Sequence, residues 1–456
     1  MKFGGKNIYI IGIGGISLSA LAILLVNFGS RVQGSDENNS EIITKLKNMG
    51  INVFLSHSAE NIKQDVDFVV YSAAISEDNV ELKRARELNK PCFTRAEVLG
   101  EIAANYENVI AVSGSHGKTT TTGMIANCFI LAKKQPTVHV GGVLKDQNTN
   151  IIVGGKKYFI TEACEYKNSF LALHNNTVAC VLNVQADHMD FFKTIDNLQN
   201  SFKTFLSQTG KNGINIINID DEFLQKTKLS HKCITYGIKT PKADIVACNI
   251  VENKLSKFEF DIKYFGSTLT RVSLPISGFH EIYNALACFA TCFYMGISPF
   301  IIKKGIEKFK GVKRRNEEIG RINGALVIHD YAHHPTEIQA NIDAAKRFTN
   351  GNVYVIFQPH TFSRTKLLWD DFVKSLSSCF MSILYPIYPA REEPISGVTS
   401  AKLSESICDL GGFSLYFDTF EKIVEYLKSK VNKNDTILIL GAGNIVDICP
   451  YFEDDE

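Results

Sequence analysis

The chain has 456 residues, of which 45% are apolar, and its 49 basic and 48 acidic side chains leave a net charge of +1. This composition is ordinary for a globular protein and argues against a disordered or fibrous chain. The balanced charge offers no basic excess for binding nucleic acid or a membrane surface. No apolar run reaches about 18 residues, so we expect no membrane insertion. A chain of this length is expected to form about two to four domains.

The eleven cysteines occur without a Cys-x-x-Cys pair, and several lie inside apolar runs. That pattern is typical of reduced core residues in a cytosolic protein, rather than of disulfides or a zinc site. The N-terminal segment has a short apolar stretch that ends in glycines. It lacks the longer apolar region and the small-residue cleavage site of a secretory signal. We therefore expect a cytoplasmic protein.

The first block, about residues 1–97, alternates apolar strand-like segments with helix-like segments. This alternation predicts a parallel sheet with right-handed crossovers, as in a Rossmann-like domain. Gly12, Gly14 and Gly15 stand where the first predicted strand turns into a helix, so their backbone N–H groups are placed to face a diphosphate. Asp36 ends the second predicted strand, where a nucleotide ribose is usually held.

Ser17 stands where the dinucleotide-binding pattern GxGxxG has its third glycine. This departure leaves three interpretations of the glycine turn open. The turn holds a dinucleotide, it holds another diphosphate ligand such as a UDP-sugar, or it is a tight turn with no ligand.

The second block, about residues 98–312, contains the strongest motif in the chain. A strand-like segment and a helix-like segment flank the sequence Gly114-Ser115-His116-Gly117-Lys118-Thr119. The consensus phosphate loop has a further glycine at the position of Val112, so the spacing here is shortened. The chemistry is preserved, because glycines let backbone amides converge on phosphate oxygens, Lys118 supplies a cation and the Thr119 hydroxyl can bind Mg²⁺.

Two later strands of this block end in polar side chains. One runs into Glu162 and Glu165, and the other ends near Asp187 and His188. The carboxyl ends of parallel strands form the crevice in which such sheets bind ligands. Mg²⁺ prefers oxygen ligands, so His188 taken alone is better explained as a loop histidine that caps a helix. The neighbouring carboxylates shift that balance towards a metal ligand.

The end of this block departs from the crossover pattern. Residues 245–277 alternate polar and apolar side chains, which predicts an antiparallel hairpin. In the helix that follows, His280 and Asn284 are four residues apart and therefore lie on one face. Arg314 and Arg315 mark the next boundary, either as a charged linker or as arginines that reach phosphates.

The third block, residues 313–456, is again an alternating α/β pattern. Its apolar strands are followed by polar loops, one of them containing Asp330, Tyr331 and His333 and another containing His360 and Arg364. Several such loops predict a ligand surface along one edge of this sheet.

Ten segments in order over nearly the full length make the chain resemble the Mur ligase family of peptidoglycan synthesis. They are GIGGISLSALA (12–22), GSHGKTTTT (114–122), EACEYKNSFL (162–171), NVQADHMD (183–190), GFHEIYNALA (278–287), RRNEE (314–318), HDYAHHPTEI (329–338), FQPHTFSRT (357–365), IYPAREEPISG (387–397) and LGAGNI (440–445). The resemblance implies three α/β domains: a Rossmann-like UDP-sugar domain (1–97), a central P-loop ATPase domain (98–312) whose mainly parallel sheet carries an antiparallel hairpin, and a C-terminal Rossmann-like domain (313–456) that closes over the amino acid.

The resemblance also implies a reaction and its small-molecule partners. An ATP-dependent ligase of this kind phosphorylates the lactyl carboxylate of UDP-N-acetylmuramate, and the amine of L-alanine then attacks the acyl phosphate. Positioned cations carry most of such catalysis, because charge builds on transferred oxygens in both steps. The implied cofactors are ATP and two Mg²⁺ ions, which Mn²⁺ can replace, and the implied state is a monomer or a weak homodimer.

Site residues follow from the resemblance by motif position. The implied catalytic set is Lys118, Glu162, His188, His333 and Arg364, with Thr119, Glu162 and His188 as metal ligands. The implied ATP contacts are Gly114, Ser115, His116, Gly117, Lys118, Thr119, Thr120, His280, Asn284, Arg314, Arg315 and Asp330. The implied UDP-sugar contacts are Gly12, Gly14, Gly15, Ser35 and Asp36, and the implied muramoyl and alanine pocket contains Tyr331, His333, His360 and Arg364.

Three positions depart from the family pattern. His329 stands where the family often has an aspartate, and Thr361 stands where an arginine usually follows the histidine of the FQPH loop. Cys164 occupies an acidic position of the commoner EADES segment. Because Glu162 is retained, we expect metal binding to survive the change at Cys164.

Three other functions compete with this interpretation. A related recycling ligase attaches a murein peptide to the same UDP-sugar, and its substrate preference would distinguish it. A nicotinamide-dependent oxidoreductase would leave the phosphate loop without a use. A P-loop ATPase that acts as a switch or motor would leave the first and third blocks unexplained.

Overall fold

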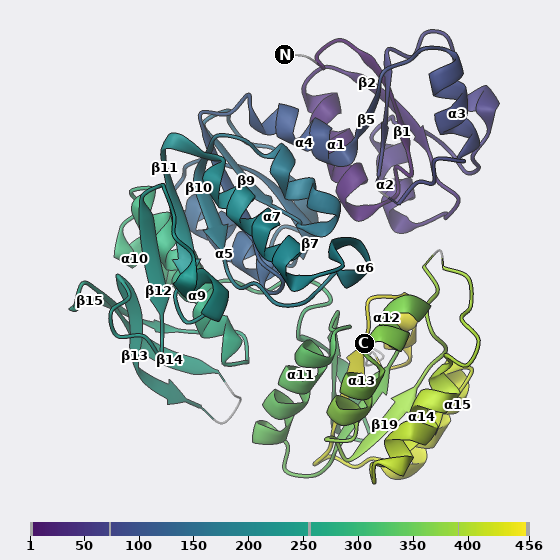
Figure 1. The fold of residues 1–456 in the computed structure, drawn as a ribbon. Helices are drawn as coiled ribbons and strands as arrows, with labels where there is room; N and C mark the ends of the chain where they lie inside the picture. The colour runs from purple at the N-terminus through teal and green to yellow at the C-terminus, as the bar shows by residue number, and fades with distance from the viewer. Residues whose placement is uncertain (1–2, 73, 254–256, 391, 453–456) are drawn as a thin grey trace. The chain divides into compact units, whose positions relative to one another are not determined.

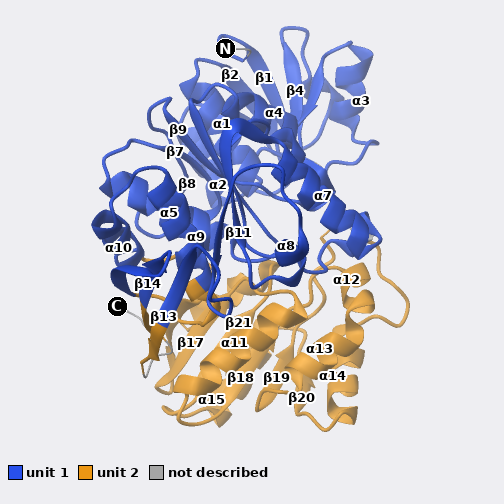
Figure 2. Ribbon diagram, turned by 60° about the vertical axis from the view of Figure 1, so that its left-hand side comes forward, with its two compact units in different colours: residues 1–248, 261–272, 283–309 blue, residues 249–260, 273–282, 310–456 orange. Residues whose placement is uncertain are grey.

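The computed structural model describes residues 3–72, 74–253, 257–390 and 392–452, which form three sheets flanked by helices (Figure 1). This is the mixed α/β class, with mainly parallel sheets, that the alternating pattern predicts. The chain separates into two compact units (Figure 2). Unit 1 comprises residues 1–248, 261–272 and 283–309, and unit 2 comprises residues 249–260, 273–282 and 310–456.

The first sheet has the order β3-β2-β1-β4-β5 with every pair parallel, as in a Rossmann-like domain. The order reverses between β1 and β4, and the carboxyl end of β1 leads into the predicted glycine turn. Its elements are β1 (Asn7–Ile11), α1 (Ile16–Asn27), β2 (Arg31–Ser35), α2 (Glu41–Asn48), β3 (Asn52–Phe54), η1 (Ala59–Asn61), β4 (Phe68–Tyr71), α3 (Val80–Glu87), β5 (Cys92–Thr94) and α4 (Arg95–Ala103).

The second sheet has ten strands in the order β15-β14-β13-β12-β11-β10-β6-β9-β7-β8. Its strands are β6 (Asn108–Ser113), β7 (Thr137–Leu144), β8 (Thr149–Ile152), β9 (Tyr158–Glu162), β10 (Asn176–Val181), β11 (Thr209–Asn218), β12 (Cys233–Gly237), β13 (Ile245–Glu252), β14 (Phe258–Tyr264) and β15 (Ser267–Ser273). A two-residue turn joins the neighbouring strands β14 and β15, so they run antiparallel and confirm the predicted hairpin. The helices are α5 (Lys118–Leu131), η2 (Tyr166–Ala172), α6 (Met189–Phe192), α7 (Ile195–Ser207), α8 (Glu222–Lys226), α9 (His280–Tyr294) and α10 (Pro299–Glu307).

The third sheet has the order β16-β17-β21-β18-β19-β20, parallel except where β16 meets β17. Its strands are β16 (Glu317–Ile322), β17 (Ala325–Asp330), β18 (Val353–Phe357), β19 (Met381–Leu384), β20 (Ser414–Tyr416) and β21 (Thr436–Leu440). Its helices are α11 (Pro335–Phe348), α12 (Phe362–Leu367), α13 (Trp369–Leu376), α14 (Ser400–Asp409), α15 (Phe420–Lys430) and η3 (Asn444–Tyr451). A capping box at His334 and a proline at the first helical position start α11 directly after the Asp330 loop.

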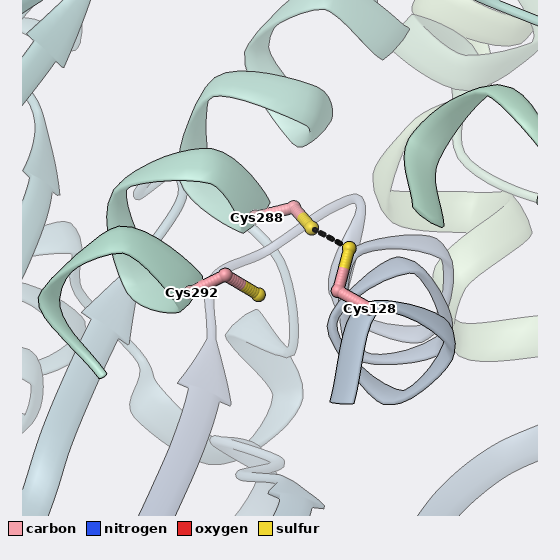
Figure 3. Close-up of side chains that lie close together, drawn as sticks. All are labelled: Cys128, Cys288 and Cys292. Carbon is pink, nitrogen blue, oxygen red and sulfur yellow. Dashed lines mark hydrogen bonds between the residues drawn. The ribbon is translucent and has the colours of Figure 1, made fainter. Parts of the chain in front are cut away.

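These strands appear in the sequence as apolar runs because their side chains are buried in the folded protein. All five residues of β18 and of β21 are buried, as expected for parallel strands covered on both faces. All eleven cysteines are free thiols, six of them are buried, and three of those gather between α5 and α9 (Figure 3). In the part of the chain that the structure describes, every helix is too short or too polar to cross a membrane.

Candidate active site

The predicted phosphate loop connects β6 to α5, so the strand and helix expected on either side are both present. Two of its residues have left-handed backbones, with φ of +139° at Gly114 and +84° at Gly117. A Cβ atom at Gly117 would collide with the side-chain amide of Asn284 on α9. Glycine is therefore required at this position by both backbone conformation and space.

Lys118, the first residue of α5, folds its ammonium group back over the loop. Its Nζ donates hydrogen bonds to the carbonyl oxygens of Gly114 at 2.5 Å and Ser115 at 3.1 Å, and it pairs with Glu165 at 3.0 Å. Burial is the largest single effect and disfavours the ammonium, but the charge and hydrogen bond of Glu165, together with the charges of Cys164 and Glu162, outweigh it and raise the pKa of Lys118. Lys118 is therefore a fully charged cation held at the mouth of the loop.

Residues after β10 support the phosphate loop from the other side, and the sequence pattern did not identify them. The Asn183 side chain accepts a hydrogen bond from the His116 N–H at 2.9 Å and donates one to the His116 carbonyl at 3.1 Å. The Ser115 hydroxyl donates to the Gln185 carbonyl at 3.0 Å and accepts from the Gln185 N–H at 2.9 Å. These four hydrogen bonds fix the loop before any phosphate binds.

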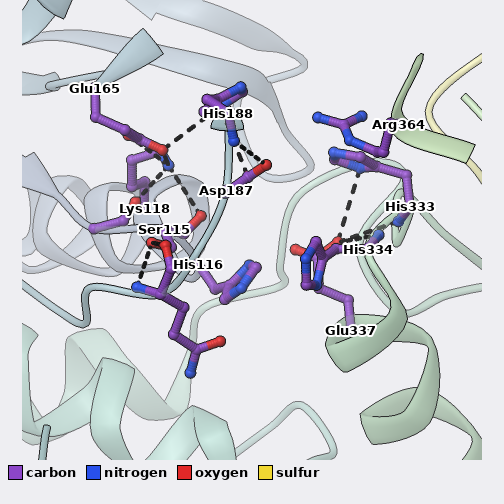
Figure 4. A network of polar contacts seen from close by, with 12 residues as sticks. Ser115, His116, Lys118, Glu165, Asp187, His188, His333, His334, Glu337 and Arg364 are labelled. Atoms are coloured by element: carbon purple, nitrogen blue, oxygen red, sulfur yellow. Dashed lines mark hydrogen bonds and ion pairs between the residues drawn. The ribbon is translucent and has the colours of Figure 1, made fainter. Parts of the chain in front are cut away.

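An imidazole and two carboxylates converge beside Lys118 (Figure 4). His188 Nε2 lies 3.7 Å from Glu165 Oε1 and 3.7 Å from Asp187 Oδ2, and the three side chains bring possible ligand atoms within 4.8 Å of one another. Glu165 is only 1% exposed. This partly buried set of oxygen and nitrogen donors fits a divalent cation.

Glu162, the carboxylate expected to bind metal, is not among the three residues whose ligand atoms lie within 4.8 Å of one another. Its Oε1 accepts a hydrogen bond from the Gly141 N–H at 2.6 Å, and a Cβ at Gly141 would meet its carboxylate. The strand β9 ends at Glu162, whereas Glu165 comes three residues later and returns toward Lys118. The structure thus brings together Glu165, Asp187 and His188, and the metal role of Glu162 and of half-buried Thr119 stays a prediction.

The N-terminal glycine turn is held closed by the carboxylate that follows β2. Asp36 Oδ2 accepts a hydrogen bond from the Gly14 N–H at 2.9 Å, and a Cβ at Gly14 would touch the Asp36 side chain. Gly12 has a φ of +77° and donates its N–H to the Ser35 carbonyl at 2.8 Å. The Ser35 hydroxyl is directed elsewhere, to buried Glu81 at 2.5 Å. The predicted UDP-sugar residues thus lie at one turn, with Gly15 as the N-terminal cap of α1.

Ser17, the departure from the dinucleotide pattern, joins α1 to the second sheet. Its hydroxyl lies 3.0 Å from Nε2 of His139 on β7 and accepts a hydrogen bond from Arg95 at 3.3 Å. His139 is 2% exposed, and its Nδ1 lies 3.1 Å from the Thr161 hydroxyl on β9. Burial, together with the charge of Arg95, lowers the pKa of His139 to about 3, so its ring is neutral.

In unit 2, the predicted residues after β17 form a cluster of their own. Asp330 is buried, and its carboxylate accepts hydrogen bonds from the N–H groups of Asn316 at 2.7 Å and Ala332 at 2.8 Å. Burial raises the pKa of Asp330 despite the nearby charge of Arg315. The guanidinium carbons of Arg314 and Arg315 lie 5.0 and 5.1 Å from the centre of the Tyr331 ring, so both arginines gather at the end of this strand.

The second predicted loop of unit 2 meets the first. The rings of His333 and His360 are 6.0 Å apart, and Arg364 lies 3.5 Å from Nδ1 of His360. Burial, followed by the charges of His333 and Arg364, lowers the pKa of His360 to about 3. His333 also contacts the Tyr331 carbonyl at 3.0 Å. Four residues that were assigned to one pocket therefore lie together within this unit. Figure 4 shows two of them, His333 and Arg364.

The two predicted adenine contacts on α9 differ in their surroundings. Asn284 is 5% exposed and lies beside Gly117 of the phosphate loop. His280 is 59% exposed at the first residue of the helix, where it pairs with Glu281 at 3.2 Å. Of the two departures in unit 2, His329 is buried on β17, and Thr361 caps α12 with a φ of +67°.

Comparison with known proteins places the chain in a family. The model of the Mur ligase family catalytic domain matches residues 7–107, that of the Mur ligase middle domain matches residues 112–292, and that of the glutamate ligase domain of Mur ligases matches residues 314–443. These matches span most of the chain, which therefore belongs to the Mur ligase family.

Two relatives and one solved structure share one activity in their names. UDP-N-acetylmuramate–L-alanine ligase of Clostridium acetobutylicum is 44% identical over 98% of this chain and 97% of its own length. The ligase of the same name from Lachnospira eligens is 42% identical over 97% of this chain and 96% of its own length. The crystal structure of UDP-N-acetylmuramate–alanine ligase from Thermotoga maritima matches with a TM-score of 0.83 at 26% identity, over 98% of each chain. A murein peptide ligase from Psychrobacter arcticus matches with a TM-score of 0.75 at 24% identity, which shows a shared fold.

Proposed function

We propose that this chain is an ATP-dependent ligase that joins L-alanine to the lactyl carboxylate of UDP-N-acetylmuramate, producing UDP-N-acetylmuramoyl-L-alanine, ADP and phosphate. The observation that carries the proposal is the grouping of Lys118, Glu165, Asp187 and His188 around the phosphate loop. These residues follow three neighbouring parallel strands, β9, β6 and β10, at their carboxyl ends. Identity above 40% to relatives named for this reaction, over nearly the full length, supports the choice of acceptor and amino acid.

The contacts of Lys118 explain how the loop would accept a nucleotide. In the structure its ammonium group is satisfied by the carbonyl oxygens of Gly114 and Ser115 and by Glu165. A triphosphate offers stronger, charged acceptors, so Lys118 would exchange the two carbonyl contacts for phosphate oxygens. The Asn183 and Ser115 hydrogen bonds keep the loop in shape during that exchange. The chain's contribution is thus a cation and backbone amides positioned before charge builds on the transferred phosphoryl group.

Glu165, Asp187 and His188 are the residues that would hold a magnesium ion here, with Thr119 and Glu162 as the further ligands implied for a two-ion site. Mg²⁺ neutralises charge on phosphate oxygens when it is bound. Manganese is expected to substitute, because it accepts the same oxygen and imidazole donors. Glu165 is held between Lys118 and His188, so its carboxylate is already oriented.

The remaining predicted residues keep the roles that the resemblance implies. Gly12, Gly14 and Gly15, with Ser35 and Asp36, are proposed to position the UDP portion. Tyr331, His333, His360 and Arg364 are proposed to contact the muramoyl group and alanine, and Asp330, Arg314 and Arg315 are proposed to contact ATP. We further propose a cytoplasmic protein that is a monomer or a weak homodimer, which light scattering after size exclusion would test.

The decisive experiment measures phosphate release with ATP, Mg²⁺ and UDP-N-acetylmuramate, with and without L-alanine, and identifies the product by mass spectrometry. We expect release that depends on both substrates and a product with the mass of UDP-N-acetylmuramoyl-L-alanine. Release without an acceptor would show a plain ATPase. Turnover only with a murein tripeptide would show the recycling ligase, the second candidate.

Variants at the loop test the residue assignments in the same assay. Lys118→Ala should lower product formation at least about 100-fold, because a cation aimed at developing charge is lost. Lys133→Ala is the matched control, since this exposed lysine follows the far end of the same helix. Glu165→Gln and Glu162→Gln, compared for Mg²⁺ dependence, separate the two carboxylates. Near-normal turnover of Lys118→Ala would remove the proposed ATP site.

A further inference from the structure

Three buried cysteines from two helices converge in the interior of unit 1 (Figure 3). Cys128 lies on α5, and Cys288 and Cys292 lie four residues apart on one face of α9. The sulfur atoms of Cys128 and Cys288 are 3.7 Å apart, and all three lie within 4.8 Å of one another. All three residues are completely shielded from solvent. We propose that this triad is a binding site for one thiophilic trivalent metalloid ion, of which arsenic(III) is the test case.

The number of sulfur atoms narrows the choice of ion. Thiolates are soft ligands that select thiophilic ions over magnesium or calcium. Structural zinc sites are almost always tetrahedral, with four protein ligands. In the described part of the chain the group consists of Cys128, Cys288 and Cys292 alone, so zinc would be one ligand short. An ion that takes three ligands matches the three sulfur atoms of the triad without a fourth ligand.

The net charge of the ion with its three thiolates narrows the choice of ion further. Burial raises the pKa values of the Cys288 and Cys292 thiols well above their ordinary range, whereas hydrogen bonds with these two thiols lower the pKa of Cys128 to about 5. Without an ion, the triad therefore carries at most about one negative charge. A net charge in a dry interior is costly. Three thiolates around a divalent ion leave one negative charge and around a monovalent ion leave two, whereas around a trivalent ion they leave none.

The binding reaction balances without any oxidant. Arsenous acid, As(OH)₃, exchanges its three As–O bonds for three As–S bonds, the three thiol protons join the departing hydroxyl groups, and three waters leave. Arsenic stays trivalent and sulfur is neither oxidised nor reduced. The product is a neutral three-sulfur complex, which suits the apolar setting of the triad.

The packing around the triad predicts slow binding and a gain in stability. A Cβ at Gly305 would strike the Cys128 sulfur, so α10 is packed closely against α5, and all three cysteines are fully buried. Uptake therefore requires a local separation of helices. Once bound, the ion links α5, which begins at Lys118, to α9, which carries Asn284. Binding to the folded state alone raises the unfolding temperature.

The test incubates the full-length reduced protein with arsenite in the presence of glutathione, which competes for single thiols, and follows uptake by native mass spectrometry. We expect one arsenic per chain with the loss of three hydrogens, together with a higher unfolding temperature. Cys180→Ser is the matched control, because Cys180 is equally buried on β10 but lies outside the triad. It should bind like the wild type. Cys288→Ser or Cys292→Ser should bind at least about tenfold more weakly, because one intramolecular bond of the chelate is lost.

Two further measurements decide the remaining outcomes. Circular dichroism of each variant separates loss of the site from loss of the fold, and Cys→Ala variants at the same positions repeat the test without a hydroxyl. Equal arsenic uptake by the wild type and the triad variants would overturn the proposal. It would also be overturned if the wild type bound no arsenic under conditions where amide hydrogen exchange shows that α5 and α9 open. Tighter binding of Zn²⁺ than of arsenite would overturn the charge argument. The result is independent of the ligase assay, so the two proposals fail separately.

Discussion

Replacing Gly117 by alanine tests whether the phosphate loop is shaped by both backbone conformation and contact with α9. The backbone at Gly117 has a φ of +84°, and a left-handed conformation costs a non-glycine residue about 1–2 kcal/mol. The added Cβ would also collide with the Asn284 side chain. Overpacking of that kind costs about 1–3 kcal/mol, so Gly117→Ala should lower the free energy of unfolding by about 2–5 kcal/mol.

Gly29 supplies a matched control within the same compact unit. Its φ is +83°, nearly the same as that of Gly117, but a Cβ there would meet nothing within 4 Å. Gly29→Ala should therefore cost only the conformational part, about 1–2 kcal/mol. Urea unfolding followed by circular dichroism measures both variants. The difference between them measures the crowding of the added Cβ by Asn284 and Leu182.

A double-mutant cycle completes the experiment. In an Asn284→Ala background the collision with the amide is removed and only a tight contact with the flexible end of Leu182, at 3.2 Å, remains. Gly117→Ala should then cost close to what Gly29→Ala costs. Equal destabilisation by Gly117→Ala and Gly29→Ala in the wild-type background would refute the proposed contact between the loop and α9. In the ligase assay Gly29→Ala should stay active, while Gly117→Ala should lose about tenfold or more, because its loop amides no longer converge on phosphate.

Three other changes have defined outcomes. Asn183→Ala removes both hydrogen bonds to the His116 peptide and should lower the free energy of unfolding by about 2 kcal/mol and raise the KM for ATP, as urea unfolding and kinetics would show. The pKa of His139 is about 3 in the folded chain against 6.5 ordinarily, so the unfolded chain binds more protons between these values and acidification destabilises the fold. His139→Gln should flatten the dependence of stability on pH in that window by up to about 1.4 kcal/mol per pH unit. Thr361 has a strained φ of +67° and caps α12. Thr361→Gly removes the strain and loses only a weak cap, so it should raise the free energy of unfolding by about 1 kcal/mol. A lower free energy of unfolding would show that the backbone at this position is not strained.

The class of fold was predictable because buried parallel strands appear in the sequence as continuous apolar runs. Runs such as the all-buried β18 and β21 read as strands without ambiguity. The edge strands β3 and β5 are three residues long and were not predicted, since so short a segment carries no periodicity. In β7, two glycines interrupt the alternation, and only pairing with β8 and β9 reveals the strand.

Site residues that belong to a sequence motif could be predicted. Site residues that are positioned by tertiary packing could not. Lys118 and His188 could be assigned from their sequence neighbours, and both lie in the cluster around the loop. The sequence favoured Glu162 as the metal ligand, which stays a prediction. That Glu165 also lies beside Lys118 and His188 depends on how the chain turns after β9. Asn183 supports the loop through contacts that span 67 residues, and no local signal marks it.

The hydrogen bonds around Ser17 show how one unfamiliar residue can be understood only with its partners. The Thr161 hydroxyl donates to the Glu162 carbonyl at 3.0 Å, so it must accept a hydrogen bond from Nδ1 of His139. Nε2 of the neutral ring is then an acceptor, and the Ser17 hydroxyl donates to it while accepting from Arg95. Each hydrogen bond from Arg95 through Ser17 and His139 to Thr161 thus has one defined direction. A glycine at position 17 has no hydroxyl group and could not link Arg95 to His139. The serine that weakens a dinucleotide interpretation therefore connects the glycine turn, through a neutral histidine, to the strand that ends at Glu162.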